Sequence, residues 1–362
     1  MHNQEDISSQ LSIKLNSKRP FIIAGPCSAE TEEQCVNTAL QLNQLGKVDV
    51  LRAGIWKPRT RPGSFEGVGS IGLSWLKRAK ALTGLPIAVE VANKYQVQEA
   101  LKHDVDIIWI GARSTTNPFS VQEIADEVKG VDIPVFIKNP INADLELWIG
   151  AVERIQKAGI KTIGLIHRGF STYGNSEYRN APLWHLAIEM KGHYPNLLFL
   201  NDPSHICGKK RLLQDVAQTA INLAYDGIMI ESHIDPEHAW SDAAQQITPS
   251  DLNMLLDSIQ WSSTNGNSSE DPSLIHLRHR IDQMDDELIL LLSKRMEISD
   301  EIGNFKKEHH LTILQMKRWN DIMNRLSQHG TKLNLSPEFI ERYFNAIHME
   351  SIRRQNDVIR KK

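Results

Sequence analysis

The sequence predicts an α/β fold in its first part, a (β/α)8 barrel of the TIM type, followed by a separate all-α helical domain. Three observations lead to this prediction. Eight short apolar or β-branched runs recur within the first 232 residues, and amphipathic stretches separate them. A polar segment rich in Ser and Asn follows near residue 261. Beyond that segment, apolar residues recur only at helical spacing.

The eight runs are expected to be buried parallel strands, and the stretches between them helices. The expected strands are Phe21–Ala24, Val48–Ala53, Ile87–Val91, Ile107–Ile110, Pro134–Lys138, Thr162–Ile166, Leu197–Leu200 and Gly227–Glu231. Among the expected helices are Thr31–Leu45, Ser70–Thr83 and Leu145–Ala158. Eight such units in about 250 residues match a (β/α)8 barrel, with a doubly wound open sheet as the alternative. We therefore expect an active site at the carboxyl ends of the strands.

The sequence divides into a barrel over residues 1–260, a flexible linker over 261–272 and a helical domain over 273–362. A long helix is expected to start near Pro272 and to carry an apolar stripe from Leu274 to Phe305, interrupted by Arg295. Because the stripe must be buried, this helix should pair in a dimer or bundle. A second helix is expected over about 313–329, and a third from about 336 onward.

Composition narrows the class of protein. The net charge of −3 gives no indication of nucleic acid or an anionic membrane as a partner. The three cysteines form no disulfide framework, and the polar first ten residues do not resemble a signal peptide. No apolar run reaches the length of a membrane span. We therefore expect a cytoplasmic protein, in which a thiol survives as a ligand.

Four residues near expected strand ends form a candidate metal site. His205 follows the seventh strand in Asp202-Pro203-Ser204-His205, on what we expect to be a loop because proline ends the strand. The other three are Cys27, Glu231 and Asp242. Sulfur, nitrogen and oxygen together suit a divalent transition ion such as manganese, iron, cobalt or zinc. The alternative is a buried thiol beside unrelated surface carboxylates.

Basic residues lie at or just after the ends of four of the expected strands. They are Arg52 and Lys57, Arg113, Lys138 and Arg168, with Arg59 and Arg61 close to Lys57. Singly, each would be a snorkelling side chain. Together on one face they would repel one another unless anions neutralised them, and such residues commonly hold phosphate and carboxylate. We therefore expect two phosphorylated substrates.

These motifs together resemble 3-deoxy-D-arabino-heptulosonate 7-phosphate (DAHP) synthase, in its short type I-beta branch. The resemblance lies in Gly25-Pro26-Cys27-Ser28, Lys57-Pro58-Arg59-Thr60, Gly111-Ala112-Arg113, Lys138-Asn139, His167-Arg168-Gly169 and Asp202-Pro203-Ser204-His205. It implies condensation of phosphoenolpyruvate with erythrose 4-phosphate at a divalent metal. Related 3-deoxy-octulosonate 8-phosphate synthases are the alternative, but they typically carry asparagine after the lysine, where this chain has Pro58.

The resemblance also implies roles for individual residues. Cys27, His205, Glu231 and Asp242 resemble the metal ligands, and Arg52, Lys57, Arg113, Lys138 and Arg168 the phosphoenolpyruvate contacts. Arg59 and Thr60 lie where the family holds the phosphate of erythrose 4-phosphate, and Arg61 replaces a small hydroxyl residue there. Lys57 is a candidate proton donor to the developing alkoxide.

The helical part carries its own pattern of cations. Lys306 lies 11 residues after Arg295 and so nearly on the same helical face. Arg278 points away from that face and is better placed to serve the pocket of a partner. Gln315 shares a face with Arg318, as Ser351 does with Gln355. The alternative is an ordinary interaction helix with solvated basic residues.

This part resembles the all-helical chorismate mutases, which are intertwined dimers. The resemblance lies in Leu277-Arg278, Ile281-Asp282, Asp285, Lys294-Arg295, Gly303, Lys306, Arg318 and Glu350-Ser351 with Gln355. It implies that Arg278, Arg295 and Arg318 hold the carboxylates of chorismate, while Lys306 and Gln355 face its ether oxygen. Trp319 replaces a glutamate of the pattern, and Gln315 an aspartate. The catalytic candidates of the whole chain are thus Lys57, His205, Arg295, Lys306 and Gln355. We further expect prephenate to inhibit the barrel, or, as the alternative, a degenerate mutase domain that serves only as a sensor.

Overall fold

A computed structural model describes residues 20–57, 63, 65–173, 176–261 and 272–360 of the chain. The chain divides into two compact units, Met1–Thr264 and Asn265–Lys362. Arg59 and Thr60, two expected substrate contacts, lie outside the described residues, as do residues 262–271 of the expected linker.

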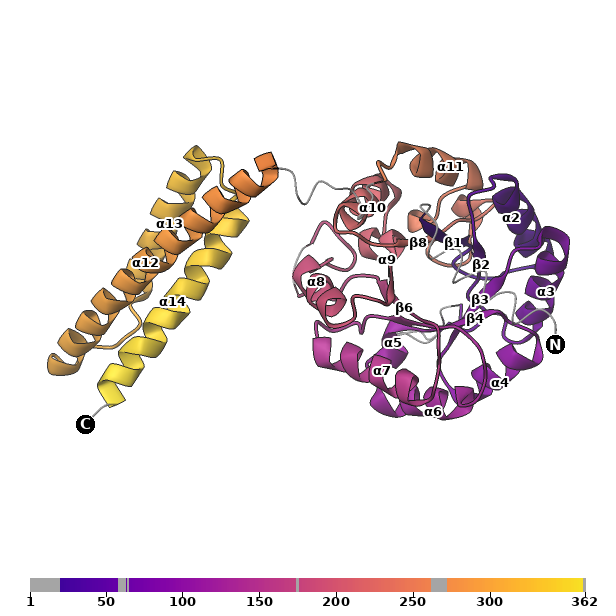
Figure 1. Ribbon diagram of the computed structural model, residues 1–362, viewed down its shortest axis with the longest axis horizontal. Coiled ribbons are helices and arrows are strands. Elements are labelled where there is room, and N and C mark those ends of the chain that lie inside the picture. Colours follow the sequence, from indigo (N-terminus) through magenta and orange to yellow (C-terminus); the bar gives the residue numbers. More distant parts are fainter. Residues whose placement is uncertain (1–19, 58–62, 64, 174–175, 262–271, 361–362) are drawn as a thin grey trace. The chain divides into compact units, whose positions relative to one another are not determined.

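The first unit is a closed barrel of eight parallel strands, which confirms the expected fold (Figure 1). The strands are β1 (Phe21–Gly25), β2 (Val50–Arg52), β3 (Ile87–Val91), β4 (Ile107–Ile110), β5 (Val135–Lys138), β6 (Ile163–His167), β7 (Leu198–Asn201) and β8 (Gly227–Glu231). Each strand pairs with its neighbours in sequence, and β1 pairs with β8 from Phe21↔Gly227 to Gly25↔Glu231. This last pairing rules out the open sheet, which would leave two edges.

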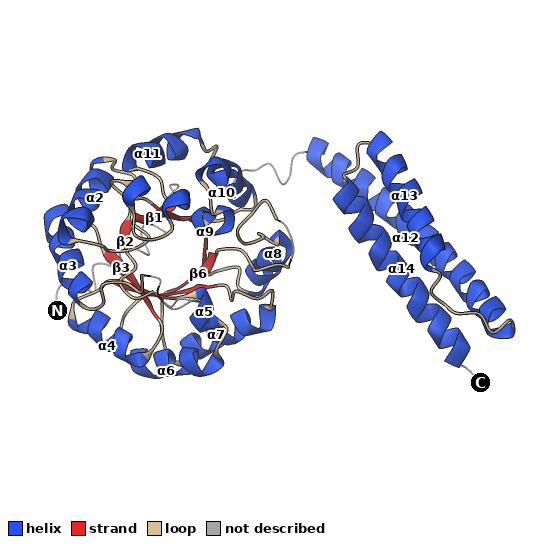
Figure 2. Cartoon of the chain, turned by 180° about the vertical axis from the view of Figure 1, so that it is seen from behind, coloured by secondary structure: helices blue, strands red, loops and turns tan. Residues whose placement is uncertain are grey.

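Helices surround the strands, and most of them form a ring outside the barrel (Figure 2). They are α2 (Glu32–Gln44), α3 (Ile71–Thr83), α4 (Lys94–Lys102), α5 (Ala112–Thr115), α6 (Pro118–Val128), α7 (Leu145–Lys157), α8 (Trp184–His193), α9 (Pro203–Cys207), α10 (Leu213–Asn222) and α11 (Pro249–Ser258), with 3-10 turns η1 (Lys210–Leu212), η2 (Pro236–His238) and η3 (Ala243–Gln245). Side-chain caps fix several starts. The Asp144 carboxylate, for example, accepts the Leu147 N–H at 3.0 Å.

Alternation along the strands brings the polar residues to one end of the barrel. A buried cluster of apolar residues from all eight strands, Phe21, Ile23, Val50, Ala88, Ile107, Trp109, Phe136, Ile166, Leu198, Leu200 and Met229, fills its interior. Because side chains alternate along a strand, the residue two positions after an inward-facing residue faces inward as well. At the carboxyl ends of five strands, this next inward-facing residue is polar. The polar successors of Val50, Phe136, Ile166, Leu200 and Met229 are Arg52, Lys138, Arg168, Asp202 and Glu231.

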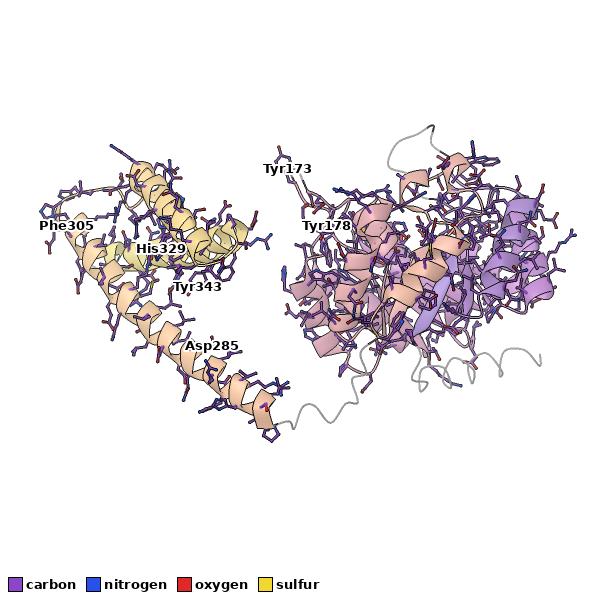
Figure 3. All side chains as sticks on the ribbon, turned by 90° about the horizontal axis from the view of Figure 1, so that it is seen from above. Tyr173, Tyr178, Asp285, Phe305, His329 and Tyr343 are labelled. Carbon is purple, nitrogen blue, oxygen red and sulfur yellow. The ribbon has the colours of Figure 1, made fainter. Side chains whose placement is uncertain are left out.

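The described part of the second unit, residues 272–360, contains three helices, α12 (Pro272–Glu308), α13 (Met316–Lys332) and α14 (Pro337–Arg360). Figure 3 labels Asp285 and Phe305 along α12. The part of α12 that faces α14 includes Met296, Ser299, Gly303 and Lys306, all buried. The expected apolar stripe is mostly exposed. Ile281, Met284 and Leu288, for example, have exposed fractions of 58%, 57% and 47%.

Two predicted elements were wrong in detail. His205 lies in helix α9 and not in a loop, because Asp202 caps this helix and Pro203 occupies its first turn. The second helix of the helical unit begins at Met316 and not near residue 313. Lys306 Nζ donates to the Ile313 carbonyl at 2.5 Å, and Gln315 is extended at the N-cap, so this segment stays outside the helix.

Candidate functional site

Asp202 organises the carboxyl end of the barrel. It follows β7 and is fully buried, and its carboxylate accepts a hydrogen bond from Lys138 Nζ at 2.8 Å. The same carboxylate lies 2.8 Å from His205 Nδ1 and accepts the His205 backbone N–H at 3.1 Å. Burial alone would raise the pKa of Asp202, but His205 and Lys138 hold it well below its ordinary value. An ionised Asp202 therefore fixes the imidazole so that Nε2 points away from it.

The four expected metal ligands lie as two close pairs. Cys27 Sγ donates to Asp242 Oδ2 at 3.2 Å, and His205 Nε2 lies 3.6 Å from Glu231 Oε1. Burial, together with the charge of Glu231, raises the pKa of the Cys27 thiol to about 12. Within the described ranges, no group of three or more His, Cys, Asp or Glu side chains is gathered closely enough to hold a metal ion.

The chemistry of these donors nevertheless fits a divalent transition ion. A thiol, an imidazole and two carboxylates supply mixed sulfur, nitrogen and oxygen ligands. Glu231 Oε1 is buried and has no hydrogen-bond partner among the described residues. Basic side chains now face the other donors, since Lys57 Nζ lies 2.7 Å from Cys27 Sγ and Arg179 Nη1 lies 2.8 Å from Asp242 Oδ1. A divalent cation would replace these positive charges.

Two of the expected anion-binding cations lie against the ring of Trp109. The Arg52 guanidinium carbon lies 5.0 Å from the ring centroid, and Lys138 Nζ lies 5.7 Å from it. The Trp109 indole N–H donates to Glu90 at 3.0 Å, which fixes the ring. Arg52 is 1% exposed, and its Nε and Nη1 atoms are buried without a partner among the described residues. Two unpaired donors on a buried cation indicate a place for an anion.

The remaining expected cations lie nearby. Arg168 is buried, and burial lowers its pKa to about 10, with Asp202 opposing and the charges of Arg179 and Arg113 adding to the shift. Arg113 is exposed, and Lys57 is half-buried at the thiol of Cys27. The structure thus brings Arg52, Lys57, Arg113, Lys138 and Arg168 to one end of the barrel.

Sequence reasoning missed several residues of this site. In the sequence, Trp109 is one more apolar residue of the fourth strand. In the structure its side chain lies in the barrel interior, where it contacts Arg52 and Lys138. Arg179 lies in a loop and Gln245 ends the 3-10 turn η3, and their contacts join distant segments. Arg179 donates to Asp242 and to Gln245 Oε1 at 2.7 Å, and Gln245 Nε2 donates to Glu231 Oε2 at 2.7 Å. No local pattern indicates such contacts.

The helical unit forms a second polar cluster between α12 and α14. Arg295 Nη1 donates to Ser351 Oγ at 2.6 Å, and Lys306 Nζ donates to Gln355 Oε1 at 3.2 Å. Burial lowers the pKa of Arg295 and of Lys306. Ser351 and Gln355 are themselves buried. Four of the expected mutase residues therefore meet within one chain.

The other expected residues of that pocket are not joined to this cluster. Arg278, Gln315 and Arg318 are exposed, and their side chains form no hydrogen bond or ion pair with the described residues. His348 is a residue that sequence reasoning missed. It lies three residues before Ser351 on α14 and stacks on Trp319. Its spacing from Ser351 and Gln355 places it on the same face of a helix, and this pattern could have identified it from the sequence.

Comparisons with known proteins match both units. Residues 6–266 match the family model described as DAHP synthetase I family, and residues 277–356 match the model described as chorismate mutase type II. No described helix is long and apolar enough to cross a membrane.

Curated relatives and solved structures match the barrel. A phospho-2-dehydro-3-deoxyheptonate aldolase of Thermotoga maritima is 32% identical over 247 residues, which cover 68% of this chain and 70% of that protein. A 2-dehydro-3-deoxyphosphooctonate aldolase of Magnetococcus marinus is 29% identical, over 66% of this chain and 86% of that protein. The crystal structure of the Thermotoga maritima DAHP synthase covers 67% of this chain and 68% of its own, with 31% identity and a TM-score of 0.59.

Proposed function

Because the chain belongs to the DAHP synthetase I family and continues into a chorismate mutase domain, we propose that each domain carries one of the two active sites of a bifunctional shikimate-pathway enzyme. The barrel, residues 1–260, condenses phosphoenolpyruvate with erythrose 4-phosphate and water to give DAHP and phosphate. The helical domain, residues 273–362, converts chorismate to prephenate, and residues 261–272 link the two. A cytoplasmic setting belongs to this proposal, since it keeps the Cys27 thiol reduced.

The cations at the carboxyl end of the barrel bind phosphoenolpyruvate. The two buried, unpartnered N–H groups of Arg52 are the observation that carries this proposal. Lys138 is tethered to Asp202, and Arg168 is buried beside them, so these positive groups are fixed before the substrate arrives. Arg113 lies at the exposed side of the site. Arg59 and Thr60 are proposed to hold the phosphate of erythrose 4-phosphate.

Cys27, His205, Glu231 and Asp242 would hold one divalent metal ion, with manganese preferred over iron, cobalt or zinc. When bound, such an ion supplies Lewis-acid polarisation of the aldehyde oxygen. Lys57 supplies the proton to the alkoxide that forms when the enol carbon of phosphoenolpyruvate attacks the aldehyde. Its position against Cys27, at 2.7 Å, supports this role because it holds an ammonium group at the metal side of the site.

In the helical domain, the proposed catalytic groups are positively charged and amide side chains held in fixed positions. Rearrangement of chorismate needs no nucleophile, only a compact conformation and stabilisation of the ether oxygen as its bond breaks. Arg295, held by Ser351, binds a carboxylate, together with Arg318. Lys306 and Gln355, which contact each other at 3.2 Å, face the ether oxygen. Gln315, at the N-cap of α13, is proposed as a further substrate contact.

A second copy of the chain completes this pocket. Every residue of α12 from 275 to 291 is exposed, including Leu277, Ile281 and Leu288. A helix face this apolar is stable in water only when a partner covers it. Arg278 lies on the same segment, so we propose that it enters the pocket of the partner subunit in a mutase dimer.

We propose that prephenate, once bound in the mutase pocket, inhibits the barrel. This proposal is based on the fusion of both domains in one chain. The second candidate function is a mutase domain that binds prephenate without catalysis. The cluster of Arg295, Lys306, Ser351 and Gln355 favours the active enzyme, because a product sensor would not need paired groups at the ether oxygen.

A paired assay of both reactions tests these proposals. A chelator should stop the condensation and leave chorismate turnover unchanged, and added manganese should restore the condensation. Erythrose 4-phosphate should be the preferred sugar, whereas activity with arabinose 5-phosphate alone would refute the assignment. Arg295→Ala should abolish chorismate turnover at an unchanged condensation rate. If the intact chain lacks chorismate turnover but still responds to prephenate, the sensor is the correct description.

A further inference from the structure

Trp319 and His348 form an aromatic stack between α13 and α14. Their ring centroids lie 4.0 Å apart, and the ring planes differ by 15°. Both side chains are half-buried, but the Nε2 atom of His348 is fully covered and has no hydrogen-bond partner among the described residues. A buried polar atom without a partner is uncommon in folded proteins and indicates a missing ligand or water.

His348 faces the mutase cluster. It lies three residues before Ser351 and seven before Gln355, so the three side chains share one face of α14. Ser351 meets Arg295 there, and Gln355 meets Lys306. Burial, with the charges of Arg295 and Lys306 adding to it, lowers the pKa of His348. The imidazole is therefore neutral near pH 7, and its free Nε2 can donate to or accept from a hydroxyl group.

The chemistry of the substrate leaves one group for this atom. Chorismate carries two carboxylates, an ether oxygen and a ring hydroxyl. The arginines of the pocket are matched to the carboxylates, and Lys306 with Gln355 to the ether oxygen. A neutral nitrogen suits an uncharged hydroxyl, and an atom already removed from water loses no further hydration when it binds one.

We propose that His348, held in place by its stack on Trp319, hydrogen-bonds the ring hydroxyl of the mutase ligand. This inference rests on the proposed mutase function and adds a specificity residue to it. Trp319 takes a position where the resembling pattern has a carboxylate, and the stack explains how an aromatic residue serves there. Trp319 orients His348, which can hydrogen-bond the hydroxyl in place of that carboxylate.

The test uses the full-length chain and two pairs of ligands. Chorismate and prephenate are each compared with the analogue that lacks the ring hydroxyl. Kinetics report on chorismate, and calorimetry reports the Kd of prephenate. His348→Phe keeps a ring on Trp319 but removes Nε2, whereas His348→Gln keeps a polar group near that position. His309→Phe is the matched control, because His309 stacks on Phe305 at 4.0 Å and 20° but is exposed.

His348→Phe should lower kcat/KM for chorismate and weaken prephenate binding by about tenfold, the scale of one lost hydrogen bond. It should leave the deoxy analogues unchanged, and His348→Gln should restore part of the loss. His309→Phe should change nothing. An equal loss with both members of a pair, or no loss with either, would overturn the proposal. If the wild-type chain binds prephenate without turning over chorismate, the mutase activity fails, while the binding comparison still decides the role of His348.

Discussion

Single side chains at the carboxyl end of the barrel owe their positions to partners on other strands. Arg52 and Lys138 would repel each other in an apolar interior, yet both face the ring of Trp109, and Asp202 neutralises Lys138. Arg52 is paired in turn with Glu231, whose Oε1 atom lies 3.4 Å from Arg52 Nη2. The buried Nε and Nη1 atoms of Arg52 have no hydrogen-bond partner among the described residues and stay available to an anionic substrate.

Replacing Trp109 tests this arrangement. Trp109→Leu should raise the KM for phosphoenolpyruvate several-fold, because a cation–π contact of about 1 kcal/mol to each cation is lost. The measurement is steady-state condensation kinetics with the two substrates varied in turn. Trp148→Leu is the control, since Trp148 is equally buried but contacts neither cation. Equal changes of KM in both variants would show that only core packing matters.

His167 makes the stability of the barrel depend on pH. Its Nε2–H donates to the Pro182 carbonyl at 2.6 Å, so Nδ1 accepts from the Tyr225 hydroxyl at 2.9 Å, and the ring is neutral. Burial lowers its pKa from 6.5 to about 4. Below pH 6.5 the unfolded chain binds a proton that the folded chain does not. The free energy of unfolding should therefore fall between pH 6.5 and 4, by up to about 3 kcal/mol.

Urea unfolding at several pH values measures this effect. His167→Gln should be less stable at neutral pH but should lose less stability than the wild type as the pH falls to 4. His238→Gln, at an exposed histidine, should keep the wild-type slope. An unchanged slope in His167→Gln would mean that another group titrates.

At the scale of elements, helix α12 carries two neighbouring faces. The apolar stripe of Leu277, Ile281 and Leu288 is exposed, and the face with Met296, Ser299 and Gly303 is covered by α14. The mean directions of the two sets differ by roughly 50° at ~100° per residue. Arg295 points in the direction of the apolar stripe, and its long side chain still reaches Ser351 on α14.

A charge on the exposed stripe should separate the subunits. Leu288→Glu places a carboxylate on the face that we propose to be covered in the dimer. Burial of an unpaired charge there costs about 3 kcal/mol or more. Sedimentation should show a shift toward monomer together with loss of chorismate turnover. Asp286→Ala, on the opposite side of α12, should retain both. Retention of the dimer by Leu288→Glu would refute the proposed interface.

The elements also show how far the sequence predicts this molecule. Strand positions follow from apolar runs, and alternation predicts which residues face inward, so Arg52 and Glu231 could be assigned to one end of the barrel. The helix around His205 could not, because Pro203 ends a strand and begins a helix with equal ease. Arg179 and Trp319 act through neighbours that are remote in sequence, and only the folded chain brings these together.

At the scale of the whole molecule, two compact units share one chain. Because we propose a different ligand for each unit, each should respond separately to heat. Manganese should raise the unfolding midpoint of the barrel, and prephenate that of the helical unit, in a calorimetric scan of the full chain. Arg295→Ala should abolish the response to prephenate and keep the response to manganese. A single transition shifted equally by both ligands would contradict independent units.

The pairing of β1 with β8 sets the moment at which the enzyme can first work. Cys27 follows one of these strands, and Glu231 ends the other, opposite Gly25 in the register. During synthesis the first strand must therefore wait for some two hundred residues before its neighbour leaves the ribosome. A nascent chain that has not yet reached β8 holds the thiol but lacks Glu231 and Asp242, two of the four residues that we propose as metal ligands.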